Sequence, residues 1–206
     1  VILFSYDQEK LTPWSYSVYL DRQNTEVRYG LSHQAAVYEI EFGKDGPAWL
    51  ILNSRNGTMK WDGEAISGSQ SLENNTRVFL YLKPGKSPET VSVLKNSGLT
   101  PEKEASGRNA CVVLKYDKNV KTVSIRYGIA FIDETQARKN MERELGNSNL
   151  KMIQENGRKV WNQALGKISV SGNSDNAKTI FYTSLYRTFE RPVCISEDGR
   201  YFSAFD

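Results

Sequence analysis

The sequence predicts a mainly β protein in which an antiparallel β-sandwich is followed by helices. Short apolar segments with period-two alternation recur from about residue 14 to residue 132. Clusters rich in Gly, Pro, Asp and Asn separate several of them, as expected for turns between short strands. After Asp133 the apolar residues recur every three or four positions, which indicates helices. A β-barrel is the alternative arrangement for the strands.

The β part is predicted to contain a strand in each alternating or continuously apolar segment. The expected strands are 14–21, 25–30, 36–42, 48–53, 77–83, 89–95, 110–116 and 121–132. Asn56-Gly57 is the strongest short hairpin signal, because both residues tolerate positive φ. The continuous apolar run "AWLILN" suggests a strand buried on both faces, with Trp49 in the core.

Three helices and a short strand are predicted after the sandwich. Asp133 is expected to cap the first helix, whose thin apolar stripe suits a connector between domains. A second helix follows over 150–168, where Gly157 is a possible interruption, and "KISVSGN" suggests a return strand. Ser174 or Asp175 is expected to cap the last helix, and Pro192 to end it.

The last helix carries an apolar stripe made of Ile180, Phe181, Leu185 and Phe189. One helix cannot bury so wide a face alone, so part of it is expected to meet helices that this chain does not contain. The predicted organisation is therefore a β-sandwich domain over 1–132, a helical linker with a return strand over 133–173, and the start of a truncated helical domain over 174–206.

Composition and isolated residues argue against several functional classes. The 27 basic and 24 acidic residues give a net charge of +3 and are mixed along the chain, which disfavours nucleic-acid binding. We expect no membrane span, because no apolar run reaches the roughly 18 residues it needs. Cys111 and Cys194 show no disulfide framework, and His33 is expected to be a turn or surface residue.

The segments "ARKNMERELG", "VWNQALGKISVSG", "KTIFYTSLYRTFERP" and "DGRYFSAFD" occur in an order that resembles glycoside hydrolase family 92. The upstream segments "SYDQEKLTPWSYSVYL", "LILNSRNGTMKW" and "NNTRVFLYL" resemble the same family, so the similarity covers nearly the whole chain. The family comprises bacterial exo-acting α-mannosidases.

The resemblance implies a galactose-mutarotase-like supersandwich joined through linker helices to an (α/α)6 barrel. It implies inverting, calcium-dependent hydrolysis that removes terminal α-mannose from glycans, by an enzyme exported to the bacterial periplasm or the exterior. In the family the catalytic carboxylates and most of the calcium site lie in the barrel, beyond the segment matching 198–206. We therefore expect this chain to be the non-catalytic N-terminal portion of a calcium-dependent parent enzyme, with no calcium bound to the chain itself.

The acids of the chain do not suggest a catalytic pair. Glu142 and Glu144 are two residues apart on a helix and point in different directions. Glu197-Asp198-Gly199 is predicted to be a turn, with direct sugar contact as the alternative. The candidate substrate-binding residues are Asp198, Tyr201, Arg187 and Arg191, and a solvated helix face is the alternative for the two arginines.

Two other functions remain open from the sequence. Trp14, Trp49, Trp61 and Trp161 could form a sugar-stacking platform on a free-standing carbohydrate-binding module, although packing roles are favoured for all four, with Trp161 filling the contact between helix and sandwich. Alternatively, the apolar stripe of the last helix could dock onto a partner protein in an interaction scaffold.

Overall fold

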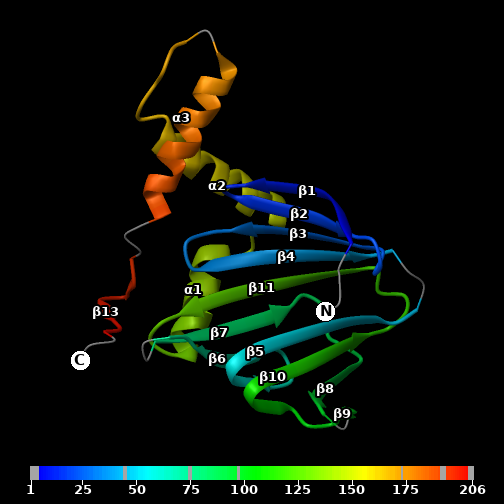
Figure 1. Cartoon of the computed structure of the whole chain (residues 1–206). Coiled ribbons are helices and arrows are strands. Elements are labelled where there is room, and N and C mark those ends of the chain that lie inside the picture. Colours follow the sequence, from blue (N-terminus) through cyan, green and yellow to red (C-terminus); the bar gives the residue numbers. More distant parts are fainter. Residues whose placement is uncertain are drawn as a thin grey trace.

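The structure is a computed structural model that describes residues 5–43, 46–73, 76–96, 98–172, 174–190 and 194–203. A curved antiparallel sheet of eleven strands, counted over these residues, carries helices on one face (Figure 1). Its strands are β1 (Tyr6–Thr12), β2 (Ser15–Leu20), β3 (Thr25–Leu31), β4 (Ala35–Phe42), β5 (Ala48–Trp61), β6 (Ile66–Ser71), β7 (Arg77–Pro84), β8 (Thr90–Lys95), β9 (Gly98–Thr100), β10 (Glu104–Tyr116) and β11 (Thr122–Ala130).

The predicted sandwich is confirmed, and it is formed by one sheet that curls over itself. The spatial order is β1-β2-β3-β4-β11-β7-β6-β5-β10-β8-β9, with antiparallel pairing throughout. One apolar core joins side chains of β4 and β11 to side chains of β5, β8 and β10, which are distant in the strand order. Leu114, Tyr116 and Val123 are among its fully buried members. The core therefore fills the concave side of the curl.

The sheet bends where the sequence predicted a hairpin, and that prediction was wrong. Asn56 and Gly57 lie inside β5, which runs unbroken from Ala48 to Trp61. Asn56 has φ 50°, yet the register with β10 is the same on both sides of it, with Gly57 opposite Gly107 and Arg55 opposite Asn109. A Cβ atom on Gly57 would lie 1.9 Å from the backbone oxygen of Ser69 in β6. The local sequence correctly indicated a positive φ at Asn56. In the structure this residue lies where β5 bends, and the chain does not reverse there.

The convex face of the sheet is covered mainly by α1 (Glu134–Leu145). Ala137, Met141 and Leu145, the predicted stripe, are buried against β4, β7 and β11. The helix approaches closely because Gly128 in β11 has no side chain, and a Cβ there would lie 2.3 Å from the backbone oxygen of Ala137. Asp133 caps the helix as predicted, since its side chain accepts a hydrogen bond from the Gln136 N–H.

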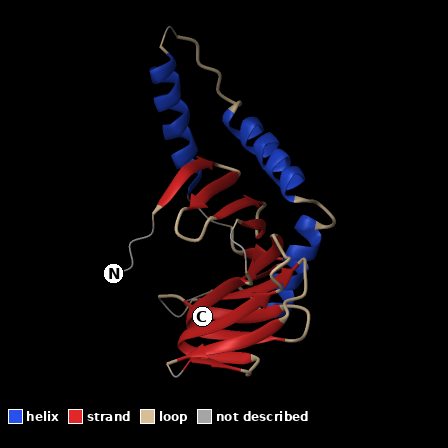
Figure 2. Cartoon of the chain, turned by 90° about the vertical axis from the view of Figure 1, so that its right-hand side faces the viewer, coloured by secondary structure: helices blue, strands red, loops and turns tan. Residues whose placement is uncertain are grey.

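The remaining elements are α2 (Leu150–Leu165), α3 (Asp175–Arg187), the 3-10 helix η1 (Thr188–Glu190), β12 (Ser196–Glu197) and β13 (Arg200–Tyr201). α2 begins against β3 and β4, and then projects beyond the sheet together with α3 (Figure 2). Gly157 does not interrupt α2; it admits Trp14, whose Cβ would be 2.7 Å from a Cβ at that glycine. Ser174 is the α3 cap.

The predicted return strand at 167–173 was wrong over its described residues, 167–172, which form no strand. This segment leads from α2 to α3, both of which stand away from the sheet, so no strand lies beside it to supply a hydrogen-bonding partner (Figure 2). Among the residues described, no helix has both the length and the apolar composition needed to cross a membrane.

The apolar stripe is only partly covered, since Ile180 and Phe189 are exposed whereas Phe181 and Leu185 are half-buried, and the further helices expected to meet it stay a prediction. α3 contributes no buried side chain among its described residues, and Ile180 is 67% exposed. Its contacts with α2 centre on Trp161, whose ring centroid lies 4.9 Å from Tyr186 and 5.9 Å from Phe189. Trp161 also lines a cavity together with Leu31, Ser32 and His33 at the edge of the sheet, and its predicted role of filling the contact between helix and sandwich stays a prediction.

Candidate functional site at the junction of sheet, linker and hairpin

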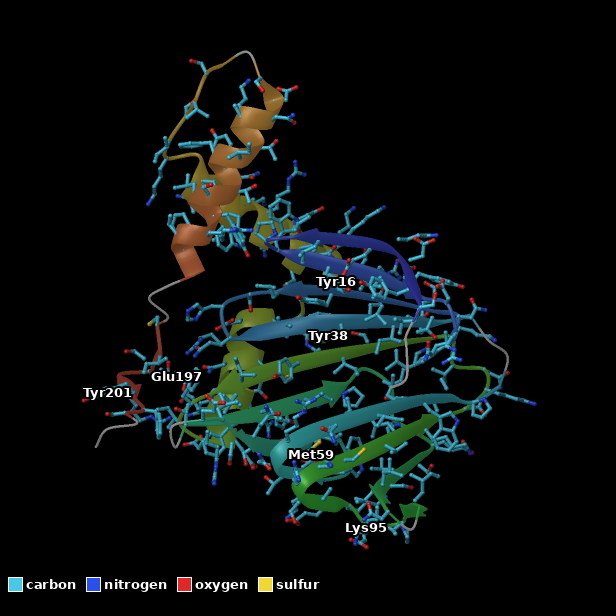
Figure 3. The ribbon with its side chains drawn as sticks, in the orientation of Figure 1. Tyr16, Tyr38, Met59, Lys95, Glu197 and Tyr201 are labelled. Carbon is cyan, nitrogen blue, oxygen red and sulfur yellow. The ribbon has the colours of Figure 1, made fainter. Side chains whose placement is uncertain are left out.

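Polar side chains concentrate where a small hairpin meets α1 and the sheet. The hairpin pairs β12 with β13 through a two-residue turn, Asp198-Gly199, as predicted for that segment. Both turn residues have positive φ, 51° for Asp198 and 77° for Gly199, the geometry that a type I′ turn requires. Because the turn has only two residues, it fixes the position of Glu197 relative to Tyr201 on the opposite strand (Figure 3).

Glu197 is the buried anchor of the hairpin, with only 1% of its surface exposed. Its Oε1 accepts hydrogen bonds from the side-chain amides of Gln34, in the β3–β4 turn, and Asn140, in α1. Its Oε2 accepts from the backbone N–H of Phe131, just after β11, at 2.9 Å. Three donors from three parts of the fold therefore compensate the loss of water around this carboxylate.

Asp198 is held by α1 from the exposed side of the same hairpin. Its Oδ2 accepts from Gln136 Nε2 at 2.8 Å, and its Oδ1 pairs with Arg143 Nη1 at 2.6 Å. The hydrogen bond from Gln136, together with the hydrogen bond and charge of Arg143, lowers the pKa of Asp198 below its ordinary value. Both carboxylate oxygens are thus engaged within the protein.

Arg200 completes the attachment on the second strand. Its guanidinium donates to Gln136 Oε1 at 2.6 Å and reaches Asp133 Oδ2 at 3.4 Å. Gln136 is fully buried, and its side-chain amide binds both Asp198 in the turn and Arg200 in β13. It therefore joins the hairpin to the start of α1. Asn140, also fully buried, uses its Oδ1 to accept from Gln136 and Arg143.

We expect the attachment of Asp198 to weaken only in strong acid. A carboxyl with a depressed pKa stabilises the folded state above its unfolded pKa, and that contribution is lost as the pH falls through the lower folded pKa. Titration of the Asp198 side chain by NMR should give a midpoint below 3.8, the ordinary value. A midpoint at or above 3.8 would show that Gln136 and Arg143 do not hold the ionised form in solution.

The four candidate substrate-binding residues are not gathered in one place. Asp198 faces α1, whereas Tyr201 is 66% exposed on the outer side of the hairpin (Figure 3). Arg187 is exposed at the end of α3. Arg191 lies outside the described residues. Sequence reasoning missed Gln34, Gln136 and Asn140, although the i, i+4 spacing of the last two beside Ala137 and Met141 placed them on the buried face of a helix.

The remaining acids, His33 and the two cysteines that the sequence singled out do not gather into a second site. Glu142 pairs with Arg138, and Glu144 accepts hydrogen bonds from Ser32 Oγ and the Gln34 N–H. His33 is exposed in the turn between β3 and β4, as predicted. Cys111 and Cys194 are free thiols. Among the described residues, no three His, Cys, Asp or Glu side chains group in a way that could hold a metal ion.

Several aromatic side chains pack on one another. Tyr29 and Tyr38 stack with centroids 5.2 Å apart, and Tyr16 lies 5.7 Å from Tyr29 (Figure 3). The prediction that Trp49 lies in the core was wrong: it is 45% exposed beside Lys115, because its neighbour Leu50 takes the inward position.

Comparison with known families identifies the chain. The sequence model of the glycosyl hydrolase family 92 N-terminal domain matches residues 2–130, and that of the catalytic domain matches residues 136–206. The chain belongs to glycoside hydrolase family 92. Its curved sheet falls in the N-terminal match of the family 92 domains, and the hairpin falls in the catalytic match. The network around Glu197 therefore joins the two matched regions.

Relatives of the chain are much longer than the chain. An uncharacterized secreted glycosidase of Arthroderma benhamiae is 29% identical over 153 residues, which is 68% of this chain and 19% of that protein. The family 92 inverting mannosidase of Bacteroides thetaiotaomicron superposes with a TM-score of 0.80 at 22% identity, over 88% of this chain and 26% of that one. A second family 92 α-mannosidase of the same bacterium gives 0.84 at 17% identity, covering 95% and 29%. The chain thus spans about a fifth of its curated relative.

Proposed function

We propose that the chain is the N-terminal sandwich, linker and first catalytic-domain segment of an α-mannosidase that removes terminal mannose from glycans with inversion. The observation that carries the proposal is the consecutive match of both family 92 domains along one chain. Support comes from structural neighbours described as an inverting mannosidase and as an α-mannosidase in complex with mannoimidazole.

In this proposal the chain supplies a scaffold and does not itself perform the chemistry. Inverting hydrolysis needs a carboxylic acid and a carboxylate about 6.5–9.5 Å apart, with room for a water molecule between them. The carboxylates of Glu142, Glu144, Glu197 and Asp198 all accept hydrogen bonds from protein groups. In the proposal these carboxylates have structural roles, and other residues of the whole enzyme act as acid and base.

Calcium dependence is part of the proposal for the whole enzyme only. Calcium takes six to eight oxygen ligands, and we propose that residues of the whole enzyme outside this chain supply most of them. We derive no step of the reaction through the ion. For sugar contact, Tyr201 fits better than Asp198, because its side chain is exposed whereas both Asp198 oxygens are occupied. Arg187 and Arg191 are proposed as further contacts.

Export from the cell is proposed from the relatives. The fungal relative is described as a secreted glycosidase, and glycan-trimming enzymes meet their substrates outside the cytoplasm. For a bacterial source this would place the enzyme in the periplasm or outside the cell.

Product analysis tests the proposed function. A longer polypeptide that contains this chain, extended as its relatives are, is expected to release β-mannose first from an α-mannoside, as followed by ¹H NMR. The 206-residue chain alone is expected to release none. Initial release of α-mannose by the longer polypeptide, or no release at all, would contradict the function. Mannose release by the short chain that is abolished by Glu197→Gln or Asp198→Asn would contradict its scaffold role.

A further inference from the structure

A buried charge without a contacting cation marks the hairpin as more than a surface turn. The donors to Glu197 are a backbone amide and two side-chain amides, and its carboxylate forms no ion pair within 4.0 Å among the described residues. By contrast, the neighbouring Asp198 is exposed and paired with Arg143. Burying an unpaired carboxylate is costly, so its three donors must be held in place by the fold.

We propose that Glu197 is a positioning residue that fixes the catalytic-domain hairpin on the N-terminal sheet, and thereby sets the position of Tyr201 at the sugar site. This inference rests on the proposed function. Glu197 reaches the sheet through Gln34 and Phe131, and it reaches α1 through Asn140. One side chain thus locates the hairpin relative to two elements at once.

The donors suit an ionised carboxylate and cannot readily adapt to an amide. The Phe131 N–H is a backbone donor and cannot be reversed. Asn140 cannot turn its carboxamide around without losing the hydrogen bonds that its Oδ1 accepts from Gln136 and Arg143. With glutamine at position 197, oxygen and nitrogen replace two equivalent oxygens, so an N–H would face an N–H on one side. Glu197→Gln therefore preserves the size of the side chain but removes at least one of the three hydrogen bonds that it accepts.

The hairpin needs this anchor because its own pairing is minimal. Only two residue pairs, Ser196 with Tyr201 and Glu197 with Arg200, join β12 and β13. An isolated two-stranded hairpin is marginally stable in water at best. Its order must therefore come from its attachment, in which Glu197 is the only fully buried side chain contributed by β12 and β13.

Amide hydrogen exchange on the 206-residue chain tests the anchor directly. In Glu197→Gln, the amides of residues 196–201 are expected to exchange at least tenfold faster than in the wild type, while those of β4 and β11 stay protected. The matched control is Glu142→Gln, because Glu142 lies on the exposed side of α1 in a pair with Arg138. Unchanged hairpin exchange in Glu197→Gln would overturn the proposal, whereas loss of protection throughout the sheet would assign Glu197 a general folding role and overturn it as well.

Kinetics of the longer enzyme test the consequence for catalysis. At a temperature where the variant remains folded, Glu197→Gln is expected to lower kcat/KM for an α-mannoside at least tenfold, with Glu142→Gln unchanged. Wild-type kcat/KM in Glu197→Gln would overturn the positioning role. An inactive wild-type enzyme would instead contradict the proposed function, and the exchange experiment would still decide whether Glu197 anchors the hairpin.

Discussion

Replacing Gly57 by alanine is expected to lower the free energy of unfolding by about 3 kcal/mol, at the upper end of the usual cost of overpacking a well-packed site. The added Cβ would lie 1.9 Å from the Ser69 oxygen and 2.4 Å from Ser54 Oγ. The Ser69 contact is with backbone, and Ser54 is buried with its hydroxyl donating to that same oxygen. Relief therefore requires β5 and β6 to separate where the sheet bends.

Urea unfolding checks this expectation. A loss of 3 kcal/mol is a large part of the roughly 5–15 kcal/mol that stabilises a typical domain. Gly172→Ala is the control, because a Cβ at that residue would meet no heavy atom within 4 Å. Equal stability of the two variants would mean that β5 and β6 do not approach closely at the bend.

The strands and helices could be predicted because their patterns are local. Alternation in "AVYEIEF" places Tyr38 and Ile40 on the concave face, where the structure has them. The stripe Ala137, Met141 and Leu145 likewise identified the buried face of α1. Each of these features follows from the period of one element, so no knowledge of its partner is needed.

Features that depend on a partner could not be predicted from local pattern. Asn56-Gly57 favours positive φ, which suits a hairpin turn but also occurs at Asn56 inside the unbroken strand β5, and only the pairing of β5 with β6 and β10 decides between the two. The return strand predicted at 167–173 was wrong for the same reason, because a strand forms only where a neighbouring strand pairs with it. Trp49 was placed in the core because a continuous apolar run does not reveal which of its faces is covered.

The candidate site was predicted only in part. The turn at Asp198-Gly199 followed from its residue types, which favour positive φ. The burial of Glu197 did not follow, because a carboxylate in a polar turn is ordinarily solvated. Its donors lie 57 to 163 residues away along the sequence, so only the folded chain brings them together.

The second large expected effect is a loss of stability on truncating Ile180 in the apolar face of α3, and its size depends on the length of the polypeptide. Ile180 is 67% exposed and Phe189 47% exposed in this chain, so truncating Ile180 should change stability little. In a longer enzyme whose further helices cover this face, Ile180→Ala would remove a buried side chain and leave a cavity. Such core truncations cost about 2–5 kcal/mol.

Lys178→Ala is the matched control for Ile180→Ala. The two residues are two positions apart on one helix, and therefore about 200° apart around its axis. Lys178 is half-buried on the side of α3 away from Ile180, so the control substitution is expected to change stability by the same amount in both polypeptides.

The change in unfolding free energy caused by Ile180→Ala, measured in this chain and in the longer polypeptide, tests most directly whether α3 begins a helical catalytic domain. We predict a change of less than about 0.5 kcal/mol in the short chain and a loss of at least 2 kcal/mol in the long one, consistent with the range for buried side chains. The same small change in both polypeptides would contradict the account, because it would show that no further helix covers the α3 face.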